Sequence, residues 1–291
     1  MSSRLRSLVL AAFAALALAG CHKPPEVRPA LWLVEGPGGQ KAWLFGTIHA
    51  LPQKVNWRSA KVEAALKQSD RLLLEVANIE DDAATAQAFA ALATSPGLPP
   101  LDRRVPADLR DELDAALKAD RFAPGSLDRY ESWAAALMLQ NAAMAAGNSD
   151  SANGIDRALV RGYDRPVEEF EGAAAQLAIF DRLPEAAQRT LLAAALAHPG
   201  EEQASMRKLE TAWANGDLAT VDAETSADSL GSPELREALL TQRNDAWLAR
   251  LVSELGQGAH PFVAVGLAHL AGQDGLPTLL AQRGYRVTRL Q

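Results

Sequence analysis

The sequence predicts a single α/β domain with a mixed or parallel sheet, built from strands near both ends of the chain around a helical middle. Three observations carry this prediction. Two apolar runs flank a Gly/Pro turn near residue 37, and a continuous apolar run follows at 71–76. Apart from a candidate strand at 165–171, strand-like patterns return only after residue 260. The intervening chain, about 81–255, is rich in Ala and Leu and has helical patterns.

The first elements are predicted in detail. Residues 30–35 and 41–46 lie on either side of Gly36-Pro37-Gly38-Gly39, which is typical of a β-hairpin. Apolar residues at helical spacing predict a helix within 57–69. The nearly all-apolar run 71–76 is typical of a parallel strand that is buried on both faces.

Later elements complete the prediction. Prolines divide the middle of the chain into short helices, and 165–171 is a candidate strand. The last segment predicts a strand at 261–266, a helix at 276–283 and a final strand at 285–290. No linker divides the folded part, so we expect one domain over residues 30–291.

The N-terminus has the pattern of a lipoprotein signal. Two arginines precede an apolar run, 8–19, which is shorter than the ~20 residues that a bilayer-spanning helix needs. The run ends in Leu18-Ala19-Gly20-Cys21, a lipobox pattern. We therefore expect residues 1–20 to be a signal peptide, Cys21 to be lipidated, and residues 21–29 to tether the domain to a membrane. The alternative is an ordinary secretory signal whose cleavage site precedes a cysteine.

Composition limits partners and location. The formal net charge is −7, and no Lys/Arg-rich block occurs, which excludes nucleic acid as an expected partner. Cys21 is the one cysteine, so no internal disulfide can form. His22 follows it in place of the aspartate linked to inner-membrane retention in enteric bacteria. This favours a lipid-anchored protein of the outer membrane that faces the periplasm.

Two Gly-x-x-His segments are the main candidates for chemistry. They are Gly46-Thr47-Ile48-His49 and Gly266-Leu267-Ala268-His269, and each follows an apolar strand. Glycine at a strand end permits close backbone approach, and a histidine beyond it lies where open α/β sheets place ligands. Glu75 follows the apolar run 71–74, where a carboxylate needs a partner. We expect His49, Glu75 and His269 to share one site.

The residue types leave two chemistries open. Two imidazoles and a carboxylate can bind a transition metal with positions left for water or substrate. The same residues can act without metal, with one histidine as a general base that the glutamate orients. The sequence has no Gly-x-Ser-x-Gly elbow, no phosphate-binding loop and no His-Glu-x-x-His, which excludes serine hydrolases, nucleotide-dependent enzymes and zincins.

These motifs, in this order, resemble the TraB/PrgY/GumN family over about residues 30–291. The family has two Gly-x-x-His motifs and a glutamate after the second of its strands, which match His49, His269 and Glu75. Shorter matches agree with this alignment, although Gly172 stands where the family usually has threonine; they are Gly154-Ile155-Asp156, Phe170-Glu171 with Gln176-Leu177, and Arg243-Asn244.

The resemblance implies an erythromycin-esterase/ChaN-like fold and, by analogy with the animal Tiki members, a metal-dependent peptidase that acts on a peptide or protein. His49, Glu75 and His269 would bind the divalent metal, with manganese or cobalt favoured over zinc or iron. Glu171 is a candidate further ligand or acid/base group. Arg243 is a candidate to bind a substrate carboxylate or to orient Glu75.

Two other functions stay open at this point. The first is a non-catalytic protein that captures a peptide, haem or another small ligand in the same crevice, with the histidines as iron ligands for haem. The second is a metal-independent esterase, as the erythromycin-esterase relatives suggest.

Overall fold

The computed structural model describes residues 24–146, 149–196 and 199–291. One sheet of six strands lies at its centre, in the order β4-β3-β5-β2-β1-β6. The strands are β1 (Leu31–Glu35), β2 (Lys41–Thr47), β3 (Arg71–Leu74), β4 (Val167–Glu169), β5 (Pro261–Gly266) and β6 (Arg286–Arg289). The predicted α/β class, with strands near both ends and a helical middle, is confirmed. The predicted signal peptide and Cys21 lie outside the described residues.

The sheet is mixed. The predicted hairpin forms between β1 and β2, with Glu35 opposite Lys41, and β6 pairs antiparallel with β1 on its other side. In contrast, β5 pairs in parallel with both β2 and β3, and β4 pairs in parallel with β3. Four neighbouring strands, β4, β3, β5 and β2, therefore end at the same edge of the sheet, where open α/β folds bind their ligands.

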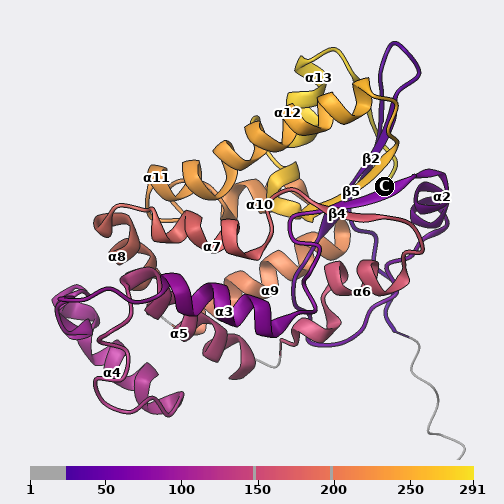
Figure 1. Cartoon of the computed structure of the whole chain (residues 1–291). Coiled ribbons are helices and arrows are strands. Elements are labelled where there is room, and N and C mark those ends of the chain that lie inside the picture. The colour runs from indigo at the N-terminus through magenta and orange to yellow at the C-terminus, as the bar shows by residue number, and fades with distance from the viewer. Residues whose placement is uncertain (1–23, 147–148, 197–198) are drawn as a thin grey trace, which may run out of the picture.

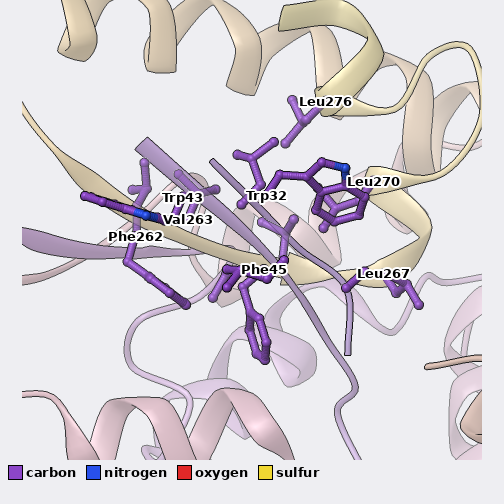
Figure 2. Packing of buried hydrophobic residues seen from close by; sticks show 14 of the residues in the cluster. Trp32, Trp43, Phe45, Phe262, Val263, Leu267, Leu270 and Leu276 are labelled. Atoms are coloured by element: carbon purple, nitrogen blue, oxygen red, sulfur yellow. The ribbon is translucent and has the colours of Figure 1, made fainter. Parts of the chain in front are cut away.

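The central strands are buried on both faces, which explains their apolar sequences. Every residue of β2 after Lys41 is buried, as are the first five residues of β5. Figure 2 shows how these strands supply the core, with Phe45 of β2 near Phe262 of β5. The two ring centroids lie 5.6 Å apart. All six tryptophans are buried.

Six helices pack on this sheet and share its hydrophobic core. Ser59 caps the first of them by accepting a hydrogen bond from the Val62 N–H, a typical start for a helix. The six are α2 (Ala60–Gln68), α6 (Ile155–Gly162), α9 (Pro199–Asn215), α10 (Leu218–Glu224), α12 (Gln242–Gly256) and α13 (Leu276–Gln282).

The remaining helices form smaller hydrophobic clusters beside the sheet. Figure 1 shows α3, α4, α5 and α8 together on one side, away from the strands. These helices are α3 (Asp82–Leu92), α4 (Arg110–Ala119), α5 (Ser132–Ala146), α7 (Ala173–Asp181), α8 (Glu185–Ala194) and α11 (Pro233–Arg236). Short helical turns are η1 (Leu101–Arg103), η2 (Ala107–Leu109), η3 (Ser151–Asn153), η5 (Leu267–Leu270) and the π-helical turn η4 (Glu237–Thr241).

Two findings concern the predicted membrane attachment. In the described ranges, no helix combines the length and apolarity that a bilayer crossing requires. The end of the predicted tether already contacts the domain, since the Val27 N–H donates to Asn56 O and the Arg28 N–H donates to Ala214 O.

The predicted strand at 165–171 is shorter than expected, because only Val167–Glu169 pairs with β3.

Candidate functional site

The four parallel strands bring the predicted residues to one edge of the sheet. His49 lies just beyond β2, Glu75 directly follows β3, Glu171 lies just beyond β4, and His269 lies in the turn η5 that follows β5. Three of them surround Gly266, the last residue of β5. A Cβ atom on Gly266 would lie 3.2 Å from Glu75 Oε1, 3.9 Å from His49 Nε2 and 3.9 Å from His269 Cδ2.

Both glycines of the Gly-x-x-His motifs permit close approach. Gly266 has φ of −50°, a value open to any residue, so a side chain here would be crowded by its neighbours, chiefly Glu75 Oε1, and not strained by the backbone. A Cβ on Gly46 would collide with the Leu267 side chain. The Gly46 carbonyl also accepts a hydrogen bond from Trp213 Nε1 at 2.9 Å. The two motifs are thereby packed against each other.

His49 is held by a carboxylate that lies far away in the sequence. Its Nδ1 lies 2.9 Å from Asp156 Oδ2. Asp156 is buried in the first turn of α6, where a negative charge is favourable. The helix reaches His49 because residue 154 is glycine: a Cβ there would collide with the His49 carbonyl. The Ile155 N–H donates to Ile48 O at 3.0 Å, which completes this contact.

The Asp156 carboxylate sets the charge of His49. It raises the pKa of His49 to about 9. The ring is therefore protonated at neutral pH. Its side chain is 61% exposed, whereas that of Asp156 is 5% exposed. Since Nδ1 is bonded to Asp156, Nε2 is the ring atom left to face the space at Gly266.

Glu75 is a buried carboxylate with three donors. Its Oε1 accepts from the Gly266 N–H at 2.7 Å. Its Oε2 accepts from Arg243 Nη2 at 2.6 Å and from Gln176 Nε2 at 3.0 Å. Burial would raise the pKa of Glu75, but the Arg243 guanidinium, the protonated His49 ring and the Gly266 N–H hold it well below its usual range. Glu75 is thus ionised throughout the physiological range.

Arg243 of α12 is saturated by partners inside the protein. Its Nη1 donates to Leu239 O at 3.1 Å and to His269 Nε2 at 3.0 Å. Its Nη2 faces both Glu75 and Glu171, and its Nε donates to Glu171 Oε1 at 3.0 Å. A guanidinium has five N–H donors, so none remains for a substrate. Arg243 therefore positions its neighbours and does not itself touch a reacting group.

The backbone before Arg243 has an unusual form. The turn η4 is π-helical, and its last bond runs from the Gln242 N–H to Glu237 O, five residues back. Such wide turns are rare and occur frequently at functional sites.

His269 is held as a neutral ring. Its Nδ1 lies 2.7 Å from Asn244 Oδ1. The Asn244 amide nitrogen donates to Asp274 O at 2.7 Å, which places the amide oxygen toward the ring. Nδ1 is therefore the donor, and Nε2 accepts from Arg243. Burial lowers the pKa of His269 to about 3, so Arg243 and not His269 supplies the positive charge beside Glu75.

The comparison with protein-family models gives a match. The model of the TraB/PrgY/gumN family matches residues 30–289, which include all six strands and every site residue described above. The chain belongs to the TraB/PrgY/gumN family. No curated protein and no solved structure matched the chain. The likeness of this TraB/PrgY/gumN domain to the erythromycin-esterase/ChaN fold therefore stays a prediction.

The metal implied by the resemblance can be tested against these donors. In the described part of this TraB/PrgY/gumN chain, no three His, Cys, Asp or Glu side chains are grouped so that they could hold a metal ion. The reason lies in the hydrogen bonds: the Nε2 lone pair of His269 accepts from Arg243, which also occupies Glu75 Oε2. The residues in this arrangement do not fit a resident metal.

Reasoning from the residues missed three partners in this TraB/PrgY/gumN site. Asp156 and Gln176 had been matched to the family only as parts of short segments, yet they bind His49 and Glu75 respectively. Asn244 had been matched in the same way and bonds to His269. The one available signal was their place in the shorter family-like segments. Glu171 accepts from Arg243 and from Trp247 Nε1.

Proposed function

We propose that this protein is a hydrolase of acyl bonds, with peptides as the favoured substrates, and that the His49–Asp156 pair activates water. One observation carries the proposal. A buried carboxylate orients a histidine through Nδ1, and the Nε2 of that histidine and Glu75 Oε1 both lie close to Gly266. A general base held in this way is the arrangement that hydrolysis by water requires.

The residues support a simple reaction. The reaction needs the deprotonated form of His49, which its pKa of about 9 makes the minor form at neutral pH. In that form a water molecule next to Gly266 has two acceptors, Glu75 Oε1 and His49 Nε2. His49 takes one proton from the water as its oxygen attacks the carbonyl carbon of the substrate. Asp156 stabilises the imidazolium that forms. His49 then returns the proton to the leaving nitrogen or oxygen as its bond to carbon breaks, which leaves the acid and the amine or alcohol as products.

Arg243, His269 and Glu171 act on this reaction through Glu75. The guanidinium fixes Glu75 Oε2, and the Gly266 N–H fixes Oε1, so the carboxylate cannot turn away from the site. Pre-organised groups avoid reorganisation during the reaction, which is the main source of their effect.

A polar groove supports a peptide as substrate. Its volume is about 650 Å³, within the usual range for ligand sites, and it is lined by Ala50, the residue after His49, although not by His49 or Glu75. Amide and hydroxyl side chains line it, along with one carboxylate and a methionine; they are Asn141, Met144, Ser149, Asp150, Ser151 and Asn153. No Lys, Arg or His is among the lining residues. Such a groove favours a neutral or basic polar chain over an anionic one.

The other predictions rest on the sequence. Attachment to the outer membrane through Cys21 rests on the lipobox pattern. Manganese- or cobalt-dependent peptidase activity rests on the family resemblance, and no step above uses a metal. Capture of a peptide, haem or small ligand without catalysis is the alternative to hydrolysis.

The test is a screen of peptide and ester libraries with the purified full-length protein, with and without a chelator. We expect chelator-resistant hydrolysis that falls at least about 100-fold in His49→Ala, the usual effect of removing a general base. His260→Ala is the matched control, since His260 lies at the start of β5, at the strand end opposite Gly266. Equal activity in His49→Ala would contradict the proposal. Binding of peptide or haem with no turnover would favour the alternative, and chelator-sensitive hydrolysis would favour the metallopeptidase.

A further inference from the structure

The positive charge among His269, Glu75 and Glu171 is the guanidinium of Arg243. We propose that Arg243 is the resident cation of this site and that it keeps divalent metal ions away from His269, Glu75 and Glu171. The inference concerns the site of the proposed hydrolase. Its test measures metal binding and not turnover, so either proposal can fail while the other stands.

The distances would otherwise suit a metal. His269 Nε2 and Glu75 Oε1 lie 3.9 Å apart. One ion could bridge them, because metal–nitrogen and metal–oxygen bonds are about 2.1 Å long. Arg243 takes that role instead: its Nη1 lies 3.0 Å from His269 Nε2, and its Nη2 lies 2.6 Å from Glu75 Oε2.

The guanidinium and a metal ion would compete for the same lone pair. Asn244 Oδ1 accepts from Nδ1 of His269, and the Asn244 amide is itself oriented by Asp274 O. Nε2 is consequently the one acceptor of that ring. While Arg243 donates to it, the ring has no lone pair for a metal. The side chains of His269, Asn244 and Arg243 are all buried, which prevents a simple rotation of the ring away from its partners.

Removing the guanidinium would leave a metal-binding set of donors. Glu75 and Glu171 would face each other across the vacated space without a positive charge, next to the free Nε2 of His269. Two carboxylates and an imidazole are ligands that suit manganese, cobalt, zinc and iron. A divalent ion would also replace the lost charge. The expected result of the substitution is therefore a gain of metal binding.

The experiment is a Co²⁺ titration of the full-length protein, purified without a metal-affinity tag and followed by visible absorbance and calorimetry. We expect Arg243→Ala and Arg243→His to bind one Co²⁺ at least about 100-fold more tightly than the wild type. The absorbance band should be absent in the double variant Arg243→Ala/His269→Ala. Arg243→His also adds a ligand of its own, so it keeps the test open if Arg243→Ala does not fold.

Arg250→Ala is the matched control. Arg250 lies on the same helix and also pairs with two carboxylates, Glu168 and Glu254, but no histidine adjoins it among its contacts. We expect no gain of Co²⁺ binding in this variant. A stoichiometric Co²⁺ site in the wild type that disappears in His269→Ala would overturn the inference. A folded Arg243→Ala or Arg243→His protein that binds Co²⁺ no better than the wild type would overturn it too.

Discussion

Acid should destabilise this protein through His269, by an amount that follows from its burial. The folded state holds the ring neutral, with a pKa of about 3, whereas an unfolded chain titrates near 6.5. Between these values the unfolded state binds more protons than the folded state, so stability falls as pH falls. At pH 5, which lies about 1.5 units below the pKa of the unfolded chain, protonation of this histidine stabilises the unfolded state by about 2 kcal/mol.

The measurement is urea unfolding at pH 7.5 and pH 5, followed by tryptophan fluorescence, in the wild type and in His269→Gln. His49 acts with the opposite sign: its pKa of about 9 gives stability that is complete below pH 6.5 and is lost as pH rises through 9. The difference between wild type and variant isolates His269. We expect the wild type to lose about 2 kcal/mol more than the variant between the two pH values. Equal losses would refute the neutral, buried state of His269.

Three further predictions concern His49 and the residues around it. Gly154→Ala should lower stability by about 1–3 kcal/mol, because its Cβ collides with the His49 carbonyl, whereas Gly256→Ala has open space and should not; urea unfolding of both variants checks this. Thr47→Val should raise stability by about 1 kcal/mol, because the buried Thr47 hydroxyl has no partner among the described residues; a loss of stability in the same assay would show that the hydroxyl is bonded. Hydrolysis by a neutral His49 base should rise with pH toward about 9, and Asp156→Asn should shift this rise to lower pH; a rate that is flat or falling over this range in the wild type would contradict the proposed role.

The sheet and the meeting of the main site residues could be predicted from local patterns. The apolar runs at Leu72–Leu74 and 261–266 are typical of strands buried on both faces, and parallel strands end at one edge. Residues that follow such strands must then lie near each other. This is why His49, Glu75 and His269 could be placed in one site before any contact between them was known.

The partners of these residues could not be predicted in the same way. Asp156 lies 107 residues from His49, and Gln176 lies 101 residues from Glu75. Neither position breaks the helical pattern around it, so nothing local distinguishes it from a surface residue. Such contacts depend on how the helices pack on the sheet, and helix packing leaves no short-range pattern in a sequence.

The sequence by itself determined the α/β class, the family and the edge of the sheet at which the site lies, since periodicity and short motifs are local properties. Only the tertiary structure decided which atoms of that site are free. Arg243 lies 168 residues from Glu75 and 26 from His269, and it engages both. A lone pair can bind a metal, a water or a substrate only if no nearby donor already occupies it. Tertiary packing determines which donor lies nearby.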